Sequence, residues 1–341
     1  MTLEHNTTEQ PSWRLFHGDR ASHPLRAMPE APPWRKPRAD PKLARAYDDK
    51  RPEMSEATRQ RGITYQASEE IVQMVNAALH LRRPLLVTGA PGTGKSSLID
   101  AVALELGLGE PLRWPVNSRS TLREALYNYD AIGRAQHRAN RQEDADALKD
   151  EDFLELGPLG TALVPALRPR PLLIDEMDKA DVDLANDLLN VLEEGQFHIR
   201  ELSRLPKESY AVRMFGSEQK VEVVKGSVAR YEFPLLIITS NGERGFPPAF
   251  LRRCLQVKMP DPASDVQRLT EIVAAHLDRD TALQAKSIIR QFVDKAAAGE
   301  TVATDQLLNA VQLVFGGYRL TEADRDAMVE RLMVSLAGNV R

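Results

Sequence analysis

The chain has 341 residues, of which 42% are hydrophobic and 28% are charged, and its formal net charge is −4. This length allows about two or three domains. No apolar run approaches the about 20 residues needed to cross a bilayer, so we expect no membrane span. The slightly acidic balance gives no electrostatic reason to expect a protein that coats nucleic acid.

A single cysteine, Cys254, cannot form an intrachain disulfide, and we interpret it as a small buried hydrophobic residue. Residues 1–10 are polar and lack the apolar segment of a signal peptide. Both features are typical of a reducing compartment, so we expect a cytoplasmic protein.

Residues 1–62 differ from the rest of the chain because they hold eight of its 22 prolines. Proline at this density interrupts helices and sheet ladders, so we predict an extended N-terminal arm without its own core. Two of the three tryptophans nevertheless lie here, in Trp13-Arg14-Leu15-Phe16 and Pro32-Pro33-Trp34-Arg35. These motifs favour docking to a partner or a neighbouring subunit; a disordered leader is the alternative.

From residue 63 the pattern becomes globular. Ser68 is a plausible cap for a helix of about fifteen residues. This helix leads into an apolar run, residues 85–88, that is suited to a buried strand. The strand is followed by a loop with the spacing G-x-x-x-x-G-K-[ST] and then by a helical pattern that begins at Ser97. The loop reads Gly89-Ala90-Pro91-Gly92-Thr93-Gly94-Lys95-Ser96.

Such a loop has a specific chemistry. Its glycines allow backbone amides to face one concavity, beside the positive N-terminal end of the next helix. Lys95 adds a charge that reaches the outer phosphates of a nucleotide, and Ser96 supplies a hydroxyl to Mg²⁺. We therefore predict that residues 89–97 bind a nucleoside triphosphate. The alternative, a Gly-rich turn without a ligand, requires that strand, spacing, lysine and hydroxyl coincide by chance.

A second buried-strand pattern, residues 171–174, ends in two carboxylates, Asp175 and Glu176. Ligands of open α/β sheets lie at the carboxyl ends of the strands, where the phosphate loop also sits. We therefore expect Asp175 beside Ser96, holding Mg²⁺ through water, and Glu176 orienting a water for attack on the γ-phosphate. An Asp-Glu pair that only caps the helix at 182–194 is the alternative.

Three segments around these strands are less regular. Residues 127–134 interrupt the helical pattern, and Tyr127 and Tyr129 there could grip a client protein or simply pack. The charged stretch at 134–152 is interpreted as a solvated helix face or loop. Residues 197–232 alternate apolar and polar side chains, which predicts a β-hairpin inserted before the next strand.

The third core strand ends at Asn241, whose amide can hydrogen-bond the attacking water or a γ-phosphate oxygen. Arg252 and Arg253 follow after a short helical turn. Arginine makes charged, bidentate contacts with phosphate, although in isolation these two would be interpreted as surface residues. From residue 261 onward, four amphipathic patterns predict a small helical lid.

This order of motifs resembles the AAA+ ATPase superfamily, and more narrowly its MoxR-like branch. The resemblance spans about residues 63–320. It implies an α/β core, namely an AAA+ P-loop NTPase core at 63–260 with a parallel sheet sandwiched by helices and a β-hairpin insert. A small all-α lid domain at 261–341 follows. Besides the phosphate loop, the residues that carry the resemblance are Leu156-Gly157-Pro158-Leu159, Leu173-Ile174-Asp175-Glu176-Met177-Asp178-Lys179-Ala180 and Thr239-Ser240-Asn241-Gly242.

The resemblance also implies residue roles. Residues 89–96 match Walker A, Asp175 and Glu176 match Walker B, and Asn241 matches sensor 1. Arg253, with Arg252 second, matches the arginine finger that enters a neighbouring subunit's site. The implied ligands are ATP and Mg²⁺. The implied assembly is a ring, usually a hexamer, that remodels, assembles or activates a client, often beside a von Willebrand factor A-domain protein.

One departure and two alternatives accompany this interpretation. The third lid helix begins Ala303-Thr304-Asp305-Gln306, where the superfamily often has a sensor 2 arginine. A nucleic-acid-processing AAA+ motor, of the restriction-nuclease or helicase-loader type, is the first alternative, and a switch without hydrolysis is the second. The absence of a basic, aromatic-interleaved patch weighs against the motor. Tyr65 and Gln66 lie where the family often holds the base, or are ordinary surface residues.

Overall fold

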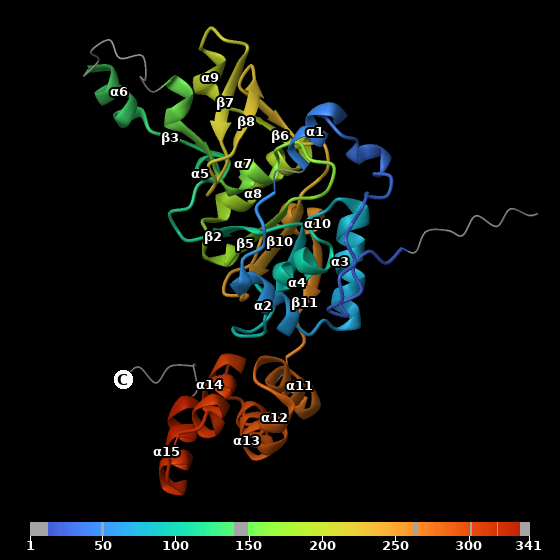
Figure 1. Cartoon of the computed structure of the whole chain (residues 1–341), viewed down its shortest axis with the longest axis vertical. Helices are drawn as coiled ribbons and strands as arrows, with labels where there is room; N and C mark the ends of the chain where they lie inside the picture. Colours follow the sequence, from blue (N-terminus) through green and yellow to red (C-terminus); the bar gives the residue numbers. More distant parts are fainter. Residues whose placement is uncertain are drawn as a thin grey trace, which may run out of the picture.

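The computed structural model describes residues 13–48, 51–139, 149–261, 265–300, 302–318 and 320–334. The first twelve residues of the predicted arm and the middle of the predicted charged stretch lie outside them. Figure 1 shows a larger part with two sheets and, at one end, a group of helices, α11 to α15.

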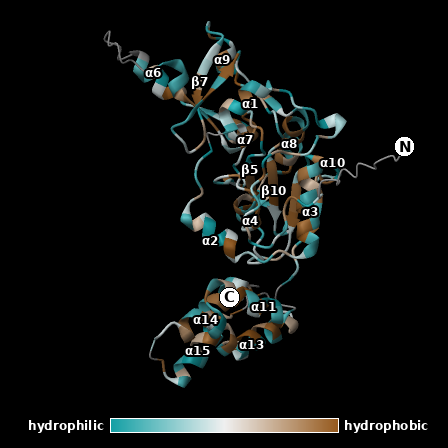
Figure 2. Ribbon diagram, turned by 45° about the vertical axis from the view of Figure 1, so that its right-hand side comes forward, coloured by the Kyte–Doolittle hydropathy of each residue, from teal (hydrophilic) through white to brown (hydrophobic). Residues whose placement is uncertain are grey.

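A five-stranded parallel sheet forms the centre of the larger part, in the order β11-β1-β10-β5-β2. All six residues of β10 are buried, as a sheet covered on both faces requires. Figure 2 shows the hydrophobic character of β10 and β5 in this interior. The strands are β1 (Leu85–Thr88), β2 (Leu112–Pro115), β5 (Pro171–Asp175), β10 (Leu235–Ser240) and β11 (Leu255–Lys258).

Helices cover both faces of this sheet, because successive strand residues point to opposite sides. Leu85 and Val87 belong to one core with α3 (Glu69–Leu81) and α4 (Leu98–Glu105). Leu86 belongs to the other core, with α8 (Val182–Glu194), α7 (Pro158–Ala162) and α10 (Pro248–Arg253). The predicted parallel sheet sandwiched by helices is therefore confirmed.

The predicted hairpin is part of a larger second sheet, which lies at the end of the molecule away from the lid (Figure 1). It has six strands in the order β3-β4-β7-β8-β9-β6. The hairpin itself is β7 (Ser209–Arg213) and β8 (Lys220–Val224), in antiparallel register. The other strands are three residues long, too short for alternation to reveal them: β3 (Tyr127–Tyr129), β4 (Leu154–Leu156), β6 (Gln196–His198) and β9 (Ser227–Ala229).

Tyr127 and Tyr129 pack against their own chain. Tyr127 is 7% exposed, and its hydroxyl donates to Glu201 Oε2 at 2.8 Å. The Tyr129 hydroxyl accepts a hydrogen bond from Arg134 Nη1 at 2.7 Å. Gripping a client protein and packing within the chain were the two interpretations of these tyrosines, and the contacts observed are packing contacts.

Short helices connect the strands of the two sheets. They are α5 (Leu122–Leu126), α6 (Ala131–Ala139), η2 (Asp150–Phe153), η3 (Met177–Lys179) and α9 (Arg200–Ser203).

The arm contains helices that its proline content did not predict. A short turn, η1 (Pro33–Arg35), is followed by α1 (Pro41–Asp48) and α2 (Glu56–Thr64). The prediction of an extended arm is therefore wrong for 41–48 and 56–64. Pro41 is the first residue of its helix, where the missing N–H costs nothing, and Ser55 caps α2 by accepting from Thr58 N.

The arm also packs on the α/β core. Phe16 is 1% exposed in the core with α3 and α4, and Tyr47 is 5% exposed in the other core. The side chain of Asn76 accepts from the backbone N–H groups of Leu15 and Phe16 and donates to the Phe16 carbonyl. Trp34, by contrast, is 76% exposed.

The lid has its own core and, in the described residues, five helices instead of the four predicted. The predicted second helix is divided at Ala285, because Asp278 caps a separate short helix through Thr281 N. None of the described helices has the length and apolar character that a membrane span requires. The lid helices are α11 (Val266–His276), α12 (Arg279–Gln284), α13 (Lys286–Ala297), α14 (Thr304–Phe315) and α15 (Glu322–Leu332).

Candidate functional site

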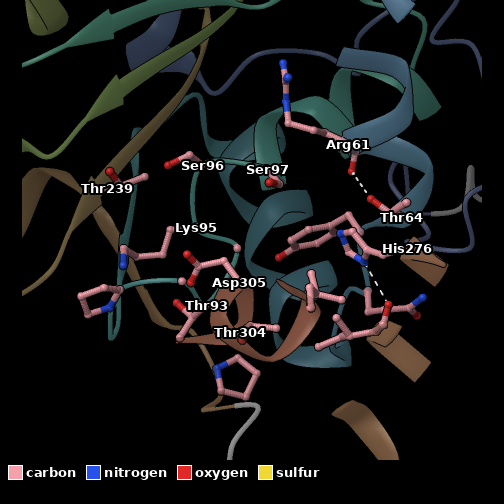
Figure 3. Close-up of a pocket in the computed structure, with 18 of the residues that line it drawn as sticks. Arg61, Thr64, Thr93, Lys95, Ser96, Ser97, Thr239, His276, Thr304 and Asp305 are labelled. Atoms are coloured by element: carbon pink, nitrogen blue, oxygen red, sulfur yellow. Dashed lines mark hydrogen bonds between the residues drawn. The ribbon is translucent and has the colours of Figure 1, made fainter. Parts of the chain in front are cut away.

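A cavity of about 440 Å³ lies between the carboxyl ends of the parallel strands and the lid (Figure 3). One side consists of the phosphate loop from Pro91 to Ser97 with Asp175, Glu176, Thr239 and Asn241. We call this the phosphate side. The other, which we call the lid side, consists of Arg61, Thr64, Tyr65, Gln66, Pro260, Arg268, Ile272, His276, Thr304, Asp305 and Leu308.

The phosphate loop has the backbone that its glycines allow. Gly92 and Gly94 have φ angles of 74° and 82°, in the left-handed region that glycine populates freely. A Cβ atom at Gly92 would lie 2.7 Å from the Cβ atom of Ala303 in the lid. The loop therefore keeps its concave form and its close approach to the lid only with glycine at this position.

Lys95 is 7% exposed and lies at the base of the loop. Its ammonium donates to the carbonyl oxygens of Gly89 and Ala90, at 2.9 and 2.8 Å. Gly89 and Ala90 thus lie behind the cavity, whereas residues 91–97 line it. Burial lowers the pKa of Lys95, and the nearby carboxylates of Asp175, Asp178 and Glu176 oppose this shift. The ammonium is a partly desolvated charge that an anion would stabilise.

Asp175 lies beside Ser96 at the carboxyl ends of the parallel strands. Ser96 Oγ donates to Asp175 Oδ1 at 2.7 Å, and Thr239 Oγ1 donates to the same oxygen at 2.6 Å. Thr239, at the end of the neighbouring strand, had no role assigned from the sequence. Hydroxyl and carboxylate oxygens are the donors that Mg²⁺ prefers, so this group fits the ion that the AAA+ fold implies.

Glu176 follows in an uncommon backbone conformation, with a φ of 59°. This left-handed geometry costs a residue with a Cβ atom roughly 1–2 kcal/mol. The backbone N–H of Glu176 donates to Thr239 Oγ1 at 2.9 Å, which helps to fix the turn. Glu176 lines the cavity, and its carboxylate accepts from Lys179 Nζ at 2.7 Å. The turn therefore places Glu176 at the cavity next to Asp175.

Asn241 lines the same side, and a buried carboxylate holds the loop that carries it. Asp178, 3% exposed, accepts from the backbone N–H groups of Asn241 and Glu243 at 3.0 Å each through Oδ2. Its other oxygen, Oδ1, has no hydrogen-bond partner among the described residues. Asp178 belongs to the motif at residues 173–180, but its place in that motif did not indicate that it positions Asn241.

The lid side brings together residues from three separate segments. Tyr65 is 8% exposed, and its burial raises the pKa of its hydroxyl above the usual range. Arg268 and His276 project from α11, and Arg268 donates to the Gln66 carbonyl at 3.3 Å. Figure 3 shows His276 and Asp305 facing the cavity from different helices.

The sequence analysis missed most of this side. Tyr65 and Gln66 were the residues considered, and both line the cavity. Arg268, Ile272 and His276 recur every fourth residue, so they share one helix face. That spacing was the available signal, but without the lid's position it could not show which face meets the phosphate loop.

Arg252 and Arg253 do not line the cavity. Arg253 pairs with Glu193 on α8, and its Nη1 donates to the Ala249 carbonyl at 3.3 Å. Arg83, just before β1, donates to the backbone carbonyls of both arginines. Of the predicted site residues, Arg252 and Arg253 thus lie away from the cavity of their own chain, and Gly89 and Ala90 lie behind its lining.

A Gly-rich phosphate loop after the first strand, two carboxylates at the end of β5 and a helical lid are the features of a P-loop nucleotide-binding domain of the AAA+ class. Residues 84–254 match the family described as AAA domain (dynein-related subfamily). The chain belongs to this family. No curated protein matches it.

Among the solved structures that resemble the chain distantly are two structures of one protein. Both are NtrX from Brucella abortus, one in complex with ADP and one with ATP. The first is 14% identical with a TM-score of 0.40 and covers 82% of this chain. The second is 15% identical with a TM-score of 0.37 and covers 81% of it. The chain spans 58% and 60% of those two structures, and at this distance the likeness carries no functional inference.

Proposed function

We propose that this protein is a MoxR-like AAA+ ATPase that hydrolyses ATP in the presence of Mg²⁺. The observation that supports this most is the convergence of Lys95, the Ser96–Asp175 pair, Glu176 and Asn241 on one cavity. A phosphate loop alone serves many nucleotide-binding proteins. A second carboxylate and an amide on the same side supply the groups that hydrolysis needs.

The proposed roles follow from these positions. Lys95 and the backbone N–H groups of residues 92–97 would bind the phosphates, and Ser96 and Asp175 would hold Mg²⁺. The bound ion neutralises phosphate charge and so favours displacement at phosphorus. Glu176 orients the attacking water and accepts its proton, and Asn241 positions the water or a γ-phosphate oxygen.

We further propose that the site is completed by a neighbouring subunit. Arg253, or else Arg252, lies outside its own cavity on a partly exposed helix end. In a closed ring, such a side chain can enter the next subunit's cavity. We propose a hexameric ring in the cytoplasm that remodels or activates a client, for example a von Willebrand factor A-domain protein. Its three parts would be an arm at 1–62, the α/β domain at 63–260 and the lid at 261–341.

The first test is ATP turnover as the concentration of purified protein is raised with Mg²⁺. We expect the rate per chain to rise with concentration, because a composite site needs two subunits. Glu176→Gln should bind ATP with nearly unchanged affinity and lose about 10³-fold in turnover. Full turnover in this variant would contradict the proposed role. A rate that rises several-fold with DNA would favour the nucleic-acid motor instead.

The second test concerns the composite site. Arg253→Ala should lose about 10³-fold in turnover and keep ATP binding, because an arginine finger acts on transition-state charge. Arg252→Ala is the comparison for the alternative assignment. Glu193→Gln removes the partner of Arg253 but keeps the guanidinium, so it should keep most turnover. An equal loss in Glu193→Gln and Arg253→Ala would indicate a structural role only.

A further inference from the structure

Two histidines of the arm meet a buried carboxylate at the end of α4, away from the nucleotide cavity. Suitable donor atoms of His17, His23 and Glu105 all lie within 4.8 Å of one another. Glu105, 2% exposed, is the last residue of α4, the helix that follows the phosphate loop. The cluster therefore joins the arm to an element that begins at the nucleotide site.

The Glu105 carboxylate is held in place but keeps capacity for another partner. Its Oε1 accepts from His17 N at 2.5 Å and its Oε2 from Gly18 N at 3.0 Å. Each carboxylate oxygen has a second lone pair.

His17 provides the second donor. Its Nδ1 is buried and has no hydrogen-bond partner among the described residues, although it lies 3.4 Å from Glu105 Oε1. That separation is about the spacing of two ligands on one tetrahedral ion with bonds of about 2.0–2.1 Å. A buried ring nitrogen without a partner is costly unless something else binds it.

His23 provides the third donor, and a second carboxylate orients it. His23 Nε2 lies 2.9 Å from Asp19 Oδ2. The centroids of the His17 and His23 imidazole rings are 4.4 Å apart. Because Asp19 takes Nε2, Nδ1 is the nitrogen left for a ligand. A carboxylate on the far ring nitrogen is the usual partner of a metal-bound histidine.

We propose that His17, His23 and Glu105 bind a divalent transition metal, Zn²⁺ before others, which fastens the arm to α4. Two imidazoles and a carboxylate match the preference of Zn²⁺ for nitrogen and oxygen donors, with a fourth position for water. Calcium and magnesium prefer oxygen donors only and fit this set poorly. The proposal does not depend on ATP hydrolysis.

The test measures Zn²⁺ binding to the chelator-treated full chain by competition with a chromogenic zinc indicator. We expect one tight site per chain, and a visible d–d spectrum when Co²⁺ replaces Zn²⁺. His17→Ala and His23→Ala should each weaken binding by at least about 10-fold, and the double variant should lose the site. Asp19→Asn should weaken it by about 10-fold at unchanged stoichiometry, because Asp19 acts through His23.

Two controls separate metal binding from misfolding. His198→Ala removes an exposed histidine on β6 and should bind Zn²⁺ like the wild type. Zn²⁺ should also raise the thermal midpoint and slow tryptic cleavage after Arg20 in the wild type, but not in the double variant. Nucleotide binding by each variant reports an intact core. Equal Zn²⁺ binding by the wild type and the double variant, or no binding by the wild type, would overturn the proposal.

Discussion

The two sides of the cavity are built in different ways. The phosphate side combines one continuous loop with the ends of two adjacent strands, and its polar groups bond one another: Ser96 and Thr239 both donate to Asp175. The lid side comes from three segments that are far apart in the sequence, and among its described lining residues only the Arg268–Gln66 hydrogen bond joins one of these segments to another.

This difference separates a phosphate side, suited both to bind the phosphates and to act on them, from a lid side suited to binding alone. The phosphate side is preorganised, since its side chains already hold fixed positions before a ligand binds. The lid side offers a buried tyrosine, the apolar side chains of Ile272 and Leu308, and two arginines, groups suited to contact a base and ribose. We therefore expect substitutions on the two sides to have different kinetic signatures.

The largest effect on ATP affinity should come from Lys95→Ala. It removes the charge of the phosphate side, and charged hydrogen bonds contribute about 1.5–3 kcal/mol each, so ATP affinity should fall by about 100-fold. Equilibrium binding of a fluorescent ATP analogue would measure this. Lys258→Ala, which removes an exposed lysine on β11, is the matched control. Unchanged affinity in Lys95→Ala would remove the distinction between the two sides.

A smaller effect is expected for Thr239→Val, which has nearly the same shape. It removes the hydroxyl that donates to Asp175 and accepts from Glu176 N, so Glu176 loses support for its left-handed turn. Turnover should fall by about 10-fold, with the free energy of unfolding lowered by about 1–3 kcal/mol. Thr239→Ser keeps the hydroxyl and should retain most activity. A steady-state assay with a denaturant titration would show both effects.

Arg268→Ala should have the smallest effect on ATP turnover, and it tests most directly whether the lid side acts through binding alone. Loss of a lid-side contact should raise the concentration of ATP needed for half-maximal turnover by about 5–10-fold and leave the saturated rate nearly unchanged. Arg290→Ala, exposed on α13, serves as the control. If the saturated rate of Arg268→Ala collapses instead, the lid arginine acts on the phosphates, in place of the absent sensor 2 residue.

The difference between the two sides also explains which site residues could be predicted from the sequence. Phosphate binding depends on backbone spacing within one loop, so residues 89–97 could be identified without a structure. Asp175 followed from the rule that parallel strands end at one edge. Thr239 and Asp178 act through contacts between strands, and one hydroxyl or carboxylate in an apolar run does not reveal its partner.

The lid side and the arm show a second limit. Whether Arg268 and Ile272 face a cavity depends on how the lid docks, which no local pattern encodes. In the arm, proline content predicted extension, but Pro41 begins a helix, and the aromatic motif at 13–16 partly packs on its own core. The short strands of the second sheet went undetected because three residues cannot display a period.

The contact between Arg83 and α10 has a consequence for communication within the proposed ring. Arg83 joins the carbonyls of Arg252 and Arg253 to the start of β1, and β1 leads directly into the phosphate loop. A guanidinium drawn toward a neighbour's γ-phosphate would pull on α10, and through Arg83 on the strand behind its own loop. In the proposed ring, this contact would give a short path by which the nucleotide state of one subunit reaches the next.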